Sequence, residues 1–508
     1  MNYFVDKLTG NDGNSGTEAY PWRSINKVNS QMPYFQWGDT IFFKRGSVWS
    51  QVDNQSLNIR CSGSAMAEVI FGAYGDGPKP LFSGWSTDTP IYIQSANLAY
   101  IGVQDLAIKN VTGVGNFGVG FTADGCRQVR LSGLDIDNIG HSGLCVMCAD
   151  GYLLEDCIIS NCGLGGIAVI GERNYHAKNG IIRRNKVSNM PGSDGITLHD
   201  GGMTGEILGA NHLLEGNVCS NCGEQGFDIT SGNSIILLAN ESFGNKISGI
   251  ITSWWVSDIL IDRHYSHDEG TAIYLATTDN IKIIRSILKN WSRNIRCDEN
   301  VNNLEIYDNL LFITAAGGSC FYESTPNYDI GMGRIIQHNS FSGENVDFKF
   351  ITYWQRNPTS TNSNFDYNRY WHPDGDPYIS RWLGQGFAGW KATYNQDANS
   401  IFSEEGMPIT HSISLTLNVE ELNDFTLTGT PTSQTVQRGQ QTTFKISAAA
   451  LGIFNKPITI SIAGLPVGVS TNLSANPINP GQEATLTIIT QSSVVLGSYT
   501  FTVTGTSQ

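Results

Sequence analysis

The sequence predicts an all-β protein in which a right-handed parallel β-helix (solenoid) is followed by a small β-sandwich. Short apolar motifs recur every 23 to 31 residues through the middle of the chain, which is a period typical of β-solenoid coils. Glycine is abundant, at 56 of 508 residues, and charged residues make up only 15%. This composition favours short strands joined by turns. Residues 425–508 are rich in Thr and Ser and alternate apolar with polar side chains, as sandwich strands do.

Each repeat consists of a Gly, an apolar residue, any residue and a second apolar residue. The copies begin at Gly118, Gly143, Gly166, Gly195, Gly226 and Gly249, and Ala272 replaces the Gly of the next copy. Parallel crossovers are nearly always right-handed, which predicts the hand of the helix. An Asn lies five or six residues before the Gly in four coils, at Asn138, Asn161, Asn189 and Asn221. We expect these Asn side chains to stack from coil to coil.

The beginning of the chain supports the same fold. Residues 24–31 are expected to form a short amphipathic helix that caps the first coil, and residues 38–44 the first long strand. With the segments Tyr3–Asp6, Asn11–Asn14 and Pro21–Asn26, the repeat resembles the pectin-lyase-like superfamily of bacterial polysaccharide-active enzymes over about residues 2–405. The resemblance implies the fold and a carbohydrate substrate, but one fold supports many reactions.

The composition predicts three segments. Residues 1–405 form the β-helix, which we expect to be the catalytic domain, residues 406–424 a linker, and residues 425–508 the sandwich. The last segment resembles the immunoglobulin-like modules of bacterial secreted enzymes, with strands expected at 443–446, 458–462, 484–488 and 498–503. It contains no Trp and a single Tyr, Tyr499. A role as a spacer is therefore favoured over carbohydrate binding, which uses aromatic faces.

Charge and hydropathy restrict the partners. The formal net charge is −15, with no basic stripe, which argues against a nucleic-acid partner. No run of 18 apolar residues is present, so we expect no membrane span. The chain begins with a strand-like segment and no leader. Either the protein is cytoplasmic, or a signal peptide was removed and Met1 replaced it. Secretion is favoured, because polysaccharides are met outside the cell.

Ten cysteines leave two interpretations open. Cys145 and Cys148, together with Cys219 and Cys222, have the spacing of a four-thiolate zinc site,. Alternatively, they are small residues of the core, because several occupy ladder positions. We favour the core and predict no metal. The sequence does not pair any disulfide.

Strand alternation sorts the repeat into inward and outward residues. The apolar residues one and three places after the Gly face inward, so the residues two and four places after it face solvent. Two outward residues on adjacent coils are ionisable, His199 and Asp228. They lie one coil apart, about 4.8 Å, and two residues apart along the strand, about 6.6 Å, so their Cα atoms should be about 8 Å apart. Asp is disfavoured within strands, which indicates a functional role for Asp228.

Further candidates surround this pair. Asp194, Asp200 and Glu224 are acidic residues close to the same coils. An Asp at the end of a strand often has a purely structural role, because its side chain hydrogen-bonds to the backbone of the turn. The coils flanking Gly195 are also the longest, and insertions on one side of a solenoid commonly form the walls of a binding site. The candidate substrate-binding residues from these insertions and the neighbouring strands are Glu172, Arg173, Tyr175, Trp254, Trp255 and Tyr274.

Three functions remain open. The first is glycoside hydrolysis with paired carboxylates, in which Asp228 acts with Asp200 or Glu224. The second is a lyase or epimerase acting on a uronate polymer with His199 as base, the only reading in which Ca²⁺ would be used. His199 and Asp200 are similar to the His-acidic pair of mannuronan epimerases, but Thr197 stands where those enzymes carry Asp. The third is a non-catalytic glycan-binding solenoid. The predicted partner is a polysaccharide or oligosaccharide, with no cofactor.

Overall fold

The structure is a computed structural model of the 508-residue chain. It describes residues 1–93, 95–121, 124–171, 176–200, 209–324, 333–344, 347–353, 363–373, 386–403, 423–452 and 455–507. The chain divides into two compact units, Met1–Pro408 and Ile409–Gln508, and each is described by itself.

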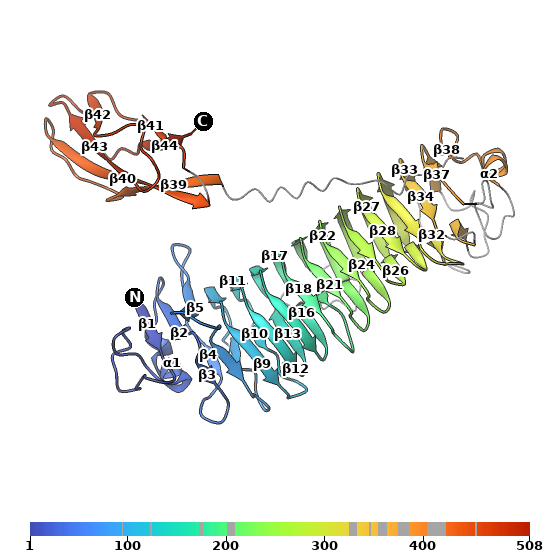
Figure 1. Ribbon diagram of the computed structural model, residues 1–508, viewed down its shortest axis with the longest axis horizontal. Helices are drawn as coiled ribbons and strands as arrows, with labels where there is room; N and C mark the ends of the chain where they lie inside the picture. The colour runs from blue at the N-terminus through green and yellow to red at the C-terminus, as the bar shows by residue number, and fades with distance from the viewer. Residues whose placement is uncertain are drawn as a thin grey trace. The chain divides into compact units, whose positions relative to one another are not determined.

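The first unit is a parallel β-helix whose successive coils stack as a ladder (Figure 1). A regular coil contributes one strand to each of three faces, here called faces 1, 2 and 3. The strands β22 (Gln225–Leu238) and β24 (Ser248–Asp262) run through both face 1 and face 2, so these faces form one 24-stranded sheet. Face 3 is a separate 14-stranded sheet. The predicted fold class is confirmed for this unit.

Face 1 contains the strands in which the Gly motif lies. Besides the first parts of β22 and β24, its strands are β4 (Leu57–Ile59), β7 (Ile91–Ile93), β10 (Val119–Phe121), β13 (Ser142–Met147), β16 (Gly165–Gly171), β19 (Ile196–Asp200), β26 (Thr271–Leu275), β29 (Arg293–Cys297), β32 (Ser319–Glu323) and β35 (Lys349–Tyr353).

Faces 2 and 3 complete each coil. Face 2 contains the second parts of β22 and β24 with β1 (Asn2–Val5), β2 (Thr40–Lys44), β5 (Val69–Tyr74), β8 (Ala99–Gln104), β11 (Arg127–Ser132), β14 (Asp150–Glu155), β17 (Lys178–Arg183), β20 (Ala210–Glu215), β27 (Thr278–Ile284), β30 (Val301–Tyr307), β33 (Arg334–Gln337) and β36 (Ser363–Asp366). Face 3 contains β3 (Val48–Trp49), β6 (Leu81–Ser83), β9 (Ala107–Val111), β12 (Asp135–Ile139), β15 (Ile158–Cys162), β18 (Lys186–Ser188), β21 (Val218–Ser220), β23 (Glu241–Phe243), β25 (Tyr265–His267), β28 (Ile287–Asn290), β31 (Leu310–Ile313), β34 (Ser340–Gly343), β37 (Arg369–Tyr370) and β38 (Ile401–Phe402).

Short helices lie at the two ends of the ladder. At the first coil, α1 (Ile25–Gln31) begins after Ser24, whose side chain accepts a hydrogen bond from the Lys27 amide at 3.1 Å. This is an N-cap, and it confirms the predicted helix. A 3-10 turn (Met32–Tyr34) follows. At the last coils, α2 (Phe387–Tyr394) buries Trp390. Among the described residues, no helix has the length and hydropathy that a membrane span requires.

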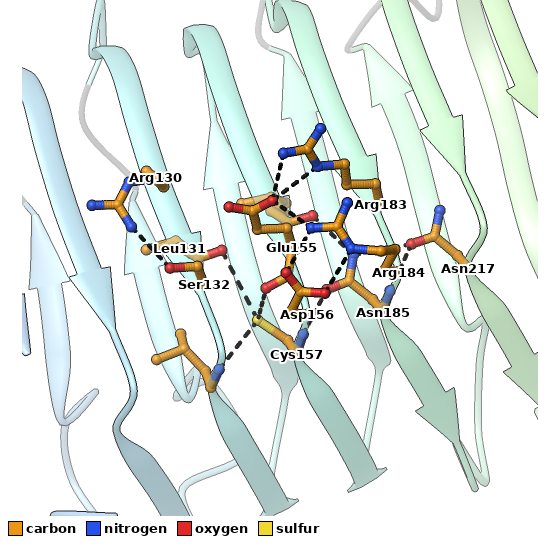
Figure 2. A network of polar contacts seen from close by, with 12 residues as sticks. Arg130, Leu131, Ser132, Glu155, Asp156, Cys157, Arg183, Arg184, Asn185 and Asn217 are labelled. Atoms are coloured by element: carbon orange, nitrogen blue, oxygen red, sulfur yellow. Dashed lines mark hydrogen bonds and ion pairs between the residues drawn. The ribbon is translucent and has the colours of Figure 1, made fainter. Parts of the chain in front are cut away.

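A buried column of side chains hydrogen-bonds one coil to the next at the corner between faces 2 and 3. Asn217 is fully buried, and its Oδ1 accepts from the backbone amide and the Nδ2 of Asn185 at 3.1 and 3.0 Å. Its Nδ2 donates to Asn240 Oδ1 and to the Ile182 carbonyl at 3.0 and 2.8 Å. Figure 2 shows where this column begins, with the Cys157 amide donating to Asn185 at 3.0 Å. These bonds satisfy backbone groups that the turn leaves unpaired.

The Asn residues expected to stack lie at turns, where Asn138 and Asn161 do hydrogen-bond to the preceding coil. Asn138, Asn161, Asn189 and Asn221 all have φ between 55 and 60°, a left-handed conformation that Asn tolerates better than most residues. Asn138 donates to Asn110 at 2.9 Å, but the contact is exposed. The buried stack therefore lies at Asn185, Asn217 and Asn240, and the predicted positions serve the turns.

Ion pairs on the outside of the same corner also join neighbouring coils (Figure 2). Arg183 and Arg184 on one coil both contact Glu155 on the preceding coil, at 2.8 and 2.9 Å. Arg184 also pairs with Asp156 at 2.7 Å, and its guanidinium holds the pKa of Asp156 below its usual range. Exposed pairs of this kind contribute at most about 1 kcal/mol each, so the buried column stabilises the corner more.

Glu269 carries a carboxyl group buried inside the solenoid. Glu269 is 1% exposed. Its Oε1 accepts from Ser242 Oγ at 2.7 Å and from Ser266 Oγ, and its Oε2 accepts from Asn245 Nδ2 at 2.9 Å. Burial raises the pKa of Glu269 to about 7, despite these hydrogen bonds. The folded protein therefore keeps a proton on Glu269 at pH values where the unfolded chain has lost it.

The second unit contains two antiparallel sheets. The larger is β39 (Asn423–Thr430), β40 (Gln441–Gly452), β43 (Glu483–Thr490) and β42 (Val469–Leu473), and the smaller pairs β41 (Thr459–Ala463) with β44 (Thr502–Thr506). Ile446, Leu486 and Ile460 from both sheets share one core. The predicted β-sandwich is therefore present. The strands expected at 443–446, 458–462 and 484–488 correspond to β40, β41 and β43, whereas β44 begins four residues later than the strand expected at 498–503.

The buried Asn column gives a first prediction. The substitution Asn217→Ala removes an acceptor and a donor from partners that no water can reach, which should lower the free energy of unfolding by roughly 3 kcal/mol. Asn364→Ala, at an exposed position of β36, is the matched control and should change it by less than about 0.5 kcal/mol,. Chemical denaturation followed by circular dichroism measures both. Equal stability of the two variants would contradict the structural role of the column.

Glu269 gives a second prediction, for the pH dependence of stability. Below about pH 4.5 the Glu269 carboxyl is protonated in both the folded and the unfolded protein. Between pH 4.5 and about 7 it ionises in the unfolded chain but not in the folded protein, so the free energy of unfolding falls over this range,. A shift from 4.5 to about 7 corresponds to roughly 3 kcal/mol,. Glu269→Gln cannot ionise, so the variant should gain about that much stability relative to the original protein between these pH values. The other acidic residues contribute equally to the pH dependence of stability in the variant and in the original protein. An unchanged difference across this range would show that Glu269 ionises normally.

Candidate active site

The register of β19 and β22 brings the predicted ionisable residues to neighbouring coils of face 1. Asp228 pairs with Thr197, and His199 pairs with Thr230. Asp228 and His199 are therefore one coil apart and two residues apart along the strands, the arrangement that the repeat predicts. Asp228 and His199 are both partly buried.

Asp194 lies just before β19 and is 6% exposed. Its Oδ1 accepts from the Gln225 amide at 2.9 Å, and its Oδ2 accepts from Ser193 Oγ at 3.3 Å. Gln225 is the first residue of β22, three positions before Asp228. The carboxyl of Asp194 therefore bridges to the next coil, on the side from which Asp228 projects. Glu224, which precedes Gln225, is exposed.

Three carboxyl groups, Asp194, Glu224 and Asp228, interact electrostatically, and we call them the acidic cluster. Burial and then the charge of Asp228 raise the pKa of Asp194 to about 7, and Glu224 adds to the effect. Burial, and to a lesser extent the charge of Glu224, raises the pKa of Asp228 to about 6. Both groups thus hold protons well above the pH at which an Asp in water loses its own.

The Thr230 hydroxyl orients the Asp228 carboxyl. Thr230 Oγ1 donates to Asp228 Oδ1 at 2.6 Å, and it lies 3.1 Å from Ser253 Oγ on the following coil. The hydrogen bond from Thr230 lowers the pKa of Asp228 but does not offset burial. Thr230 and Ser253 occupy outward positions of the repeat, as Asp228 and His199 do, but neither is ionisable and neither was predicted to be functional.

The remaining predicted catalytic residues flank the cluster. Burial lowers the pKa of His199, so its imidazole is neutral at neutral pH and can accept a proton. Asp200 is the last residue of β19, and its side chain lies outside the described part of the structure. Of the predicted substrate-binding residues, Glu172, Arg173 and Tyr175 also lie outside the described residues.

The described substrate-binding candidates lie on the following coils. Trp254 and Trp255 are 48% and 55% exposed and have φ of 61° and 74°. They occupy a β-bulge, because the register steps from Thr230–Ser253 to Gly232–Val256. Bulges and left-handed non-glycine residues cost energy and concentrate at functional sites, where they re-aim side chains. Tyr274 is on face 1, in register with Ile251, which is itself in register with Asp228.

The cysteines do not form the four-thiolate site that their spacing allows. Cys145 lies in β13 on face 1 and Cys219 in β21 on face 3, so the two pairs belong to different sheets. All ten cysteines are free and buried. Among the described residues, no three His, Cys, Asp or Glu side chains are grouped to hold a metal ion. Strand alternation predicted that Cys145 faces solvent, and this is wrong: the side chain is 0% exposed.

The arrangement can perform acid and base chemistry. A partly buried acid, protonated up to about pH 6, lies within electrostatic range of an exposed carboxylate. Pairs whose surroundings push their pKa values apart can divide the roles of proton donor and proton acceptor. The cluster is on an outer face of the solenoid, with exposed aromatic rings beside it.

Comparison with known proteins supports the fold. Residues 98–263 match the family described as "Right handed beta helix region". A 79-residue stretch is 37% identical to a lacto-N-biosidase of Bifidobacterium longum subsp. longum, and it covers 15% of this chain and 5% of that protein. The chain thus matches only a small part of the length of this curated relative.

Two solved structures have similar folds. The complex of XylC with xylose has a TM-score of 0.50 at 10% identity and covers 88% of this chain and 89% of that one. The lacto-N-biosidase of Eubacterium ramulus has a TM-score of 0.44 at 15% identity, covering 80% of this chain and 67% of that one. The family match, the XylC likeness and the strand register identify the first unit as a right-handed parallel β-helix.

Proposed function

We propose that the protein is a carbohydrate-active enzyme that hydrolyses glycosidic bonds at the acidic cluster on face 1. The observation that carries the proposal is the raised pKa of Asp228, about 6, in a carboxyl group placed beside a second, exposed carboxyl group. Glycoside hydrolysis needs one carboxylic acid to protonate the leaving oxygen and one carboxylate to act as base or nucleophile. The short match to a lacto-N-biosidase is consistent with a carbohydrate substrate.

The three carboxyl groups take different roles in this proposal. Asp228 is the proton donor, because it is partly exposed and holds its proton to about pH 6. Glu224 is exposed at the end of the preceding turn and is the carboxylate base or nucleophile. Asp194 is almost fully buried and bonded to the backbone. It is therefore a positioning residue that fixes the start of β22.

The surrounding residues supply the binding surface. Trp254, Trp255 and Tyr274 offer flat apolar faces for sugar rings. Glu172, Arg173, Tyr175 and Asp200 remain proposed contributors to this surface. We also propose export, since a polysaccharide substrate is met outside the cell. All ten thiols are buried, which protects them from oxidation there.

The assignment of Asp228 predicts the effect of removing its proton. Asp228→Asn keeps the shape of the side chain but cannot donate a proton as a carboxylic acid does, so kcat should fall by about 10²- to 10⁴-fold. Asp76→Asn, at an exposed surface bend, is the control and should retain full activity. Turnover of saccharides that the protein binds is the measurement. If Asp228→Asn turns over normally, Asp228 is not the donor.

The pH profile is an independent prediction. A general acid works only while protonated, so kcat/KM should fall as pH rises through about 6,. Because the charge of Glu224 raises the pKa of Asp228, Glu224→Gln should move the falling limb of its residual activity to lower pH. If kcat/KM of this variant falls at the same pH as in the original protein, Glu224 and Asp228 are not electrostatically coupled.

An elimination or epimerisation reaction on a uronate polymer is the second candidate. It is favoured by the lowered pKa of His199, which leaves the imidazole neutral and able to remove a proton,. In this reaction a cation such as Ca²⁺ or a Lys or Arg would stabilise the carboxylate. Elimination creates an unsaturated product that absorbs ultraviolet light, whereas hydrolysis does not. Binding without turnover by any of these reactions would leave the non-catalytic glycan-binding function.

A further inference from the structure

We infer that face 1 contains a second carbohydrate subsite, two to five coils from Asp228 toward the C-terminus, that binds a sugar carrying a carboxylate or sulfate group. The inference rests on the proposed function, because it describes how the same face would hold a long substrate. It is built from Tyr274, Arg293, Arg296, Tyr322 and Lys349, which we call the Arg–Tyr column. Of these residues, only Tyr274 was predicted from the sequence to bind substrate.

The first part of the column is an alternating stack along one line of the register. Tyr274 pairs with Arg296, and Arg296 pairs with Tyr322. The Arg296 guanidinium lies 4.2 Å from the centre of the Tyr274 ring. All three side chains are partly buried and face outward, as Asp228 does on the same line. Stacking of this kind holds a guanidinium and a phenol ring rigid.

The second part is a neighbouring line that carries two cations. Arg293 pairs with Ser319, and Ser319 pairs with Lys349. The Arg293 guanidinium lies 4.2 Å from the centre of the Tyr322 ring, so the two lines meet at this ring. Two coils separate Arg293 from Lys349, or about 9.6 Å along the axis. The two cations therefore lie on the coils before and after the coil of Tyr322.

The charge balance of the column is positive. Asp298 accepts from Arg296 at 2.9 and 2.7 Å and neutralises it, while the Tyr274 hydroxyl donates to Asp298 at 2.6 Å. No described carboxylate forms an ion pair with Arg293 or Lys349. In a chain with a net charge of −15, two unpaired cations beside an ordered aromatic ring indicate an anionic ligand. Arg is suited to carboxylate and sulfate groups because its planar fork donates two parallel hydrogen bonds.

The position of the column specifies how such a substrate would lie. Tyr322 is four coils from Asp228, about 19 Å along the axis,. The acidic cluster would repel an anionic sugar, so the acidic group of the substrate would lie several residues from the bond that is cleaved. The substrate would then be a polysaccharide in which neutral and acidic sugars occur in the same chain, running along the solenoid axis.

Binding of defined probes tests the inference. The acidic probes are oligogalacturonate and oligosaccharides of alginate, hyaluronan and chondroitin sulfate; the neutral probes are carboxyl-reduced hyaluronan and cello-oligosaccharides of equal length. Full-length Asp228→Asn protein keeps each probe intact during calorimetry. We expect at least one acidic probe to bind about 10-fold more tightly than its neutral counterpart, with affinity that falls as salt rises. Arg293→Gln should weaken that binding about 10-fold, as loss of one charge-assisted hydrogen bond implies.

Controls separate this inference from the proposed function. Arg263→Gln changes an exposed Arg that follows the face 2 part of β24 and should leave binding unchanged, and melting temperatures confirm that the variants fold. In the active protein, Arg293→Gln should raise KM and leave kcat unchanged. The inference is overturned if no acidic probe binds at low salt, if neutral and acidic probes bind equally, or if Arg293→Gln and Lys349→Gln bind like the original protein. The hydrolase proposal fails separately, if Asp228→Asn turns over saccharides normally.

Discussion

Parallel backbone hydrogen bonds between successive coils hold each residue of face 1 beside a fixed partner on the next coil, and the candidate site depends on that register. A shift by one residue would turn Asp228 into the core and bring Phe227 to the surface. The register is maintained by the buried column through Asn185, Asn217 and Asn240, which joins the coils at a corner where the strands end. The Asp228 carboxyl is therefore positioned by a strand of the solenoid, and Asp194 and Glu224 lie just before strands of the same face.

The sequence was sufficient to predict the fold and to bring His199 and Asp228 to adjacent coils, because the Gly motif marks the register directly. Three features could not be predicted. Asn185 and Asn217 lie at a corner whose distance from the Gly differs between coils, so their alignment is hidden in the sequence. Cys145 has outward parity yet is buried, since parity gives the direction of a side chain and not what covers it. Glu269 is carried inside the solenoid by a turn, where alternation does not apply.

Face 1 changes character along its length, and this change connects the site to its proposed substrate. Around Asp228 it is acidic, with protons held by burial and mutual repulsion. At Trp254 and Trp255 a bulge projects two exposed rings in a strained conformation. From Tyr274 onward, aromatic rings alternate with guanidinium groups. A saccharide following the axis would meet acid, aromatic and cationic side chains in that order.

The most direct test of this account is a crystal structure of the Asp228→Asn protein with an intact oligosaccharide substrate. The account predicts that the saccharide lies along face 1, with a glycosidic oxygen within hydrogen-bond distance, about 3 Å, of the residue 228 side chain. It also predicts that Glu224 lies near the anomeric carbon of the same bond. A saccharide bound on face 2 or face 3, or on face 1 with no glycosidic oxygen near residue 228, would contradict it.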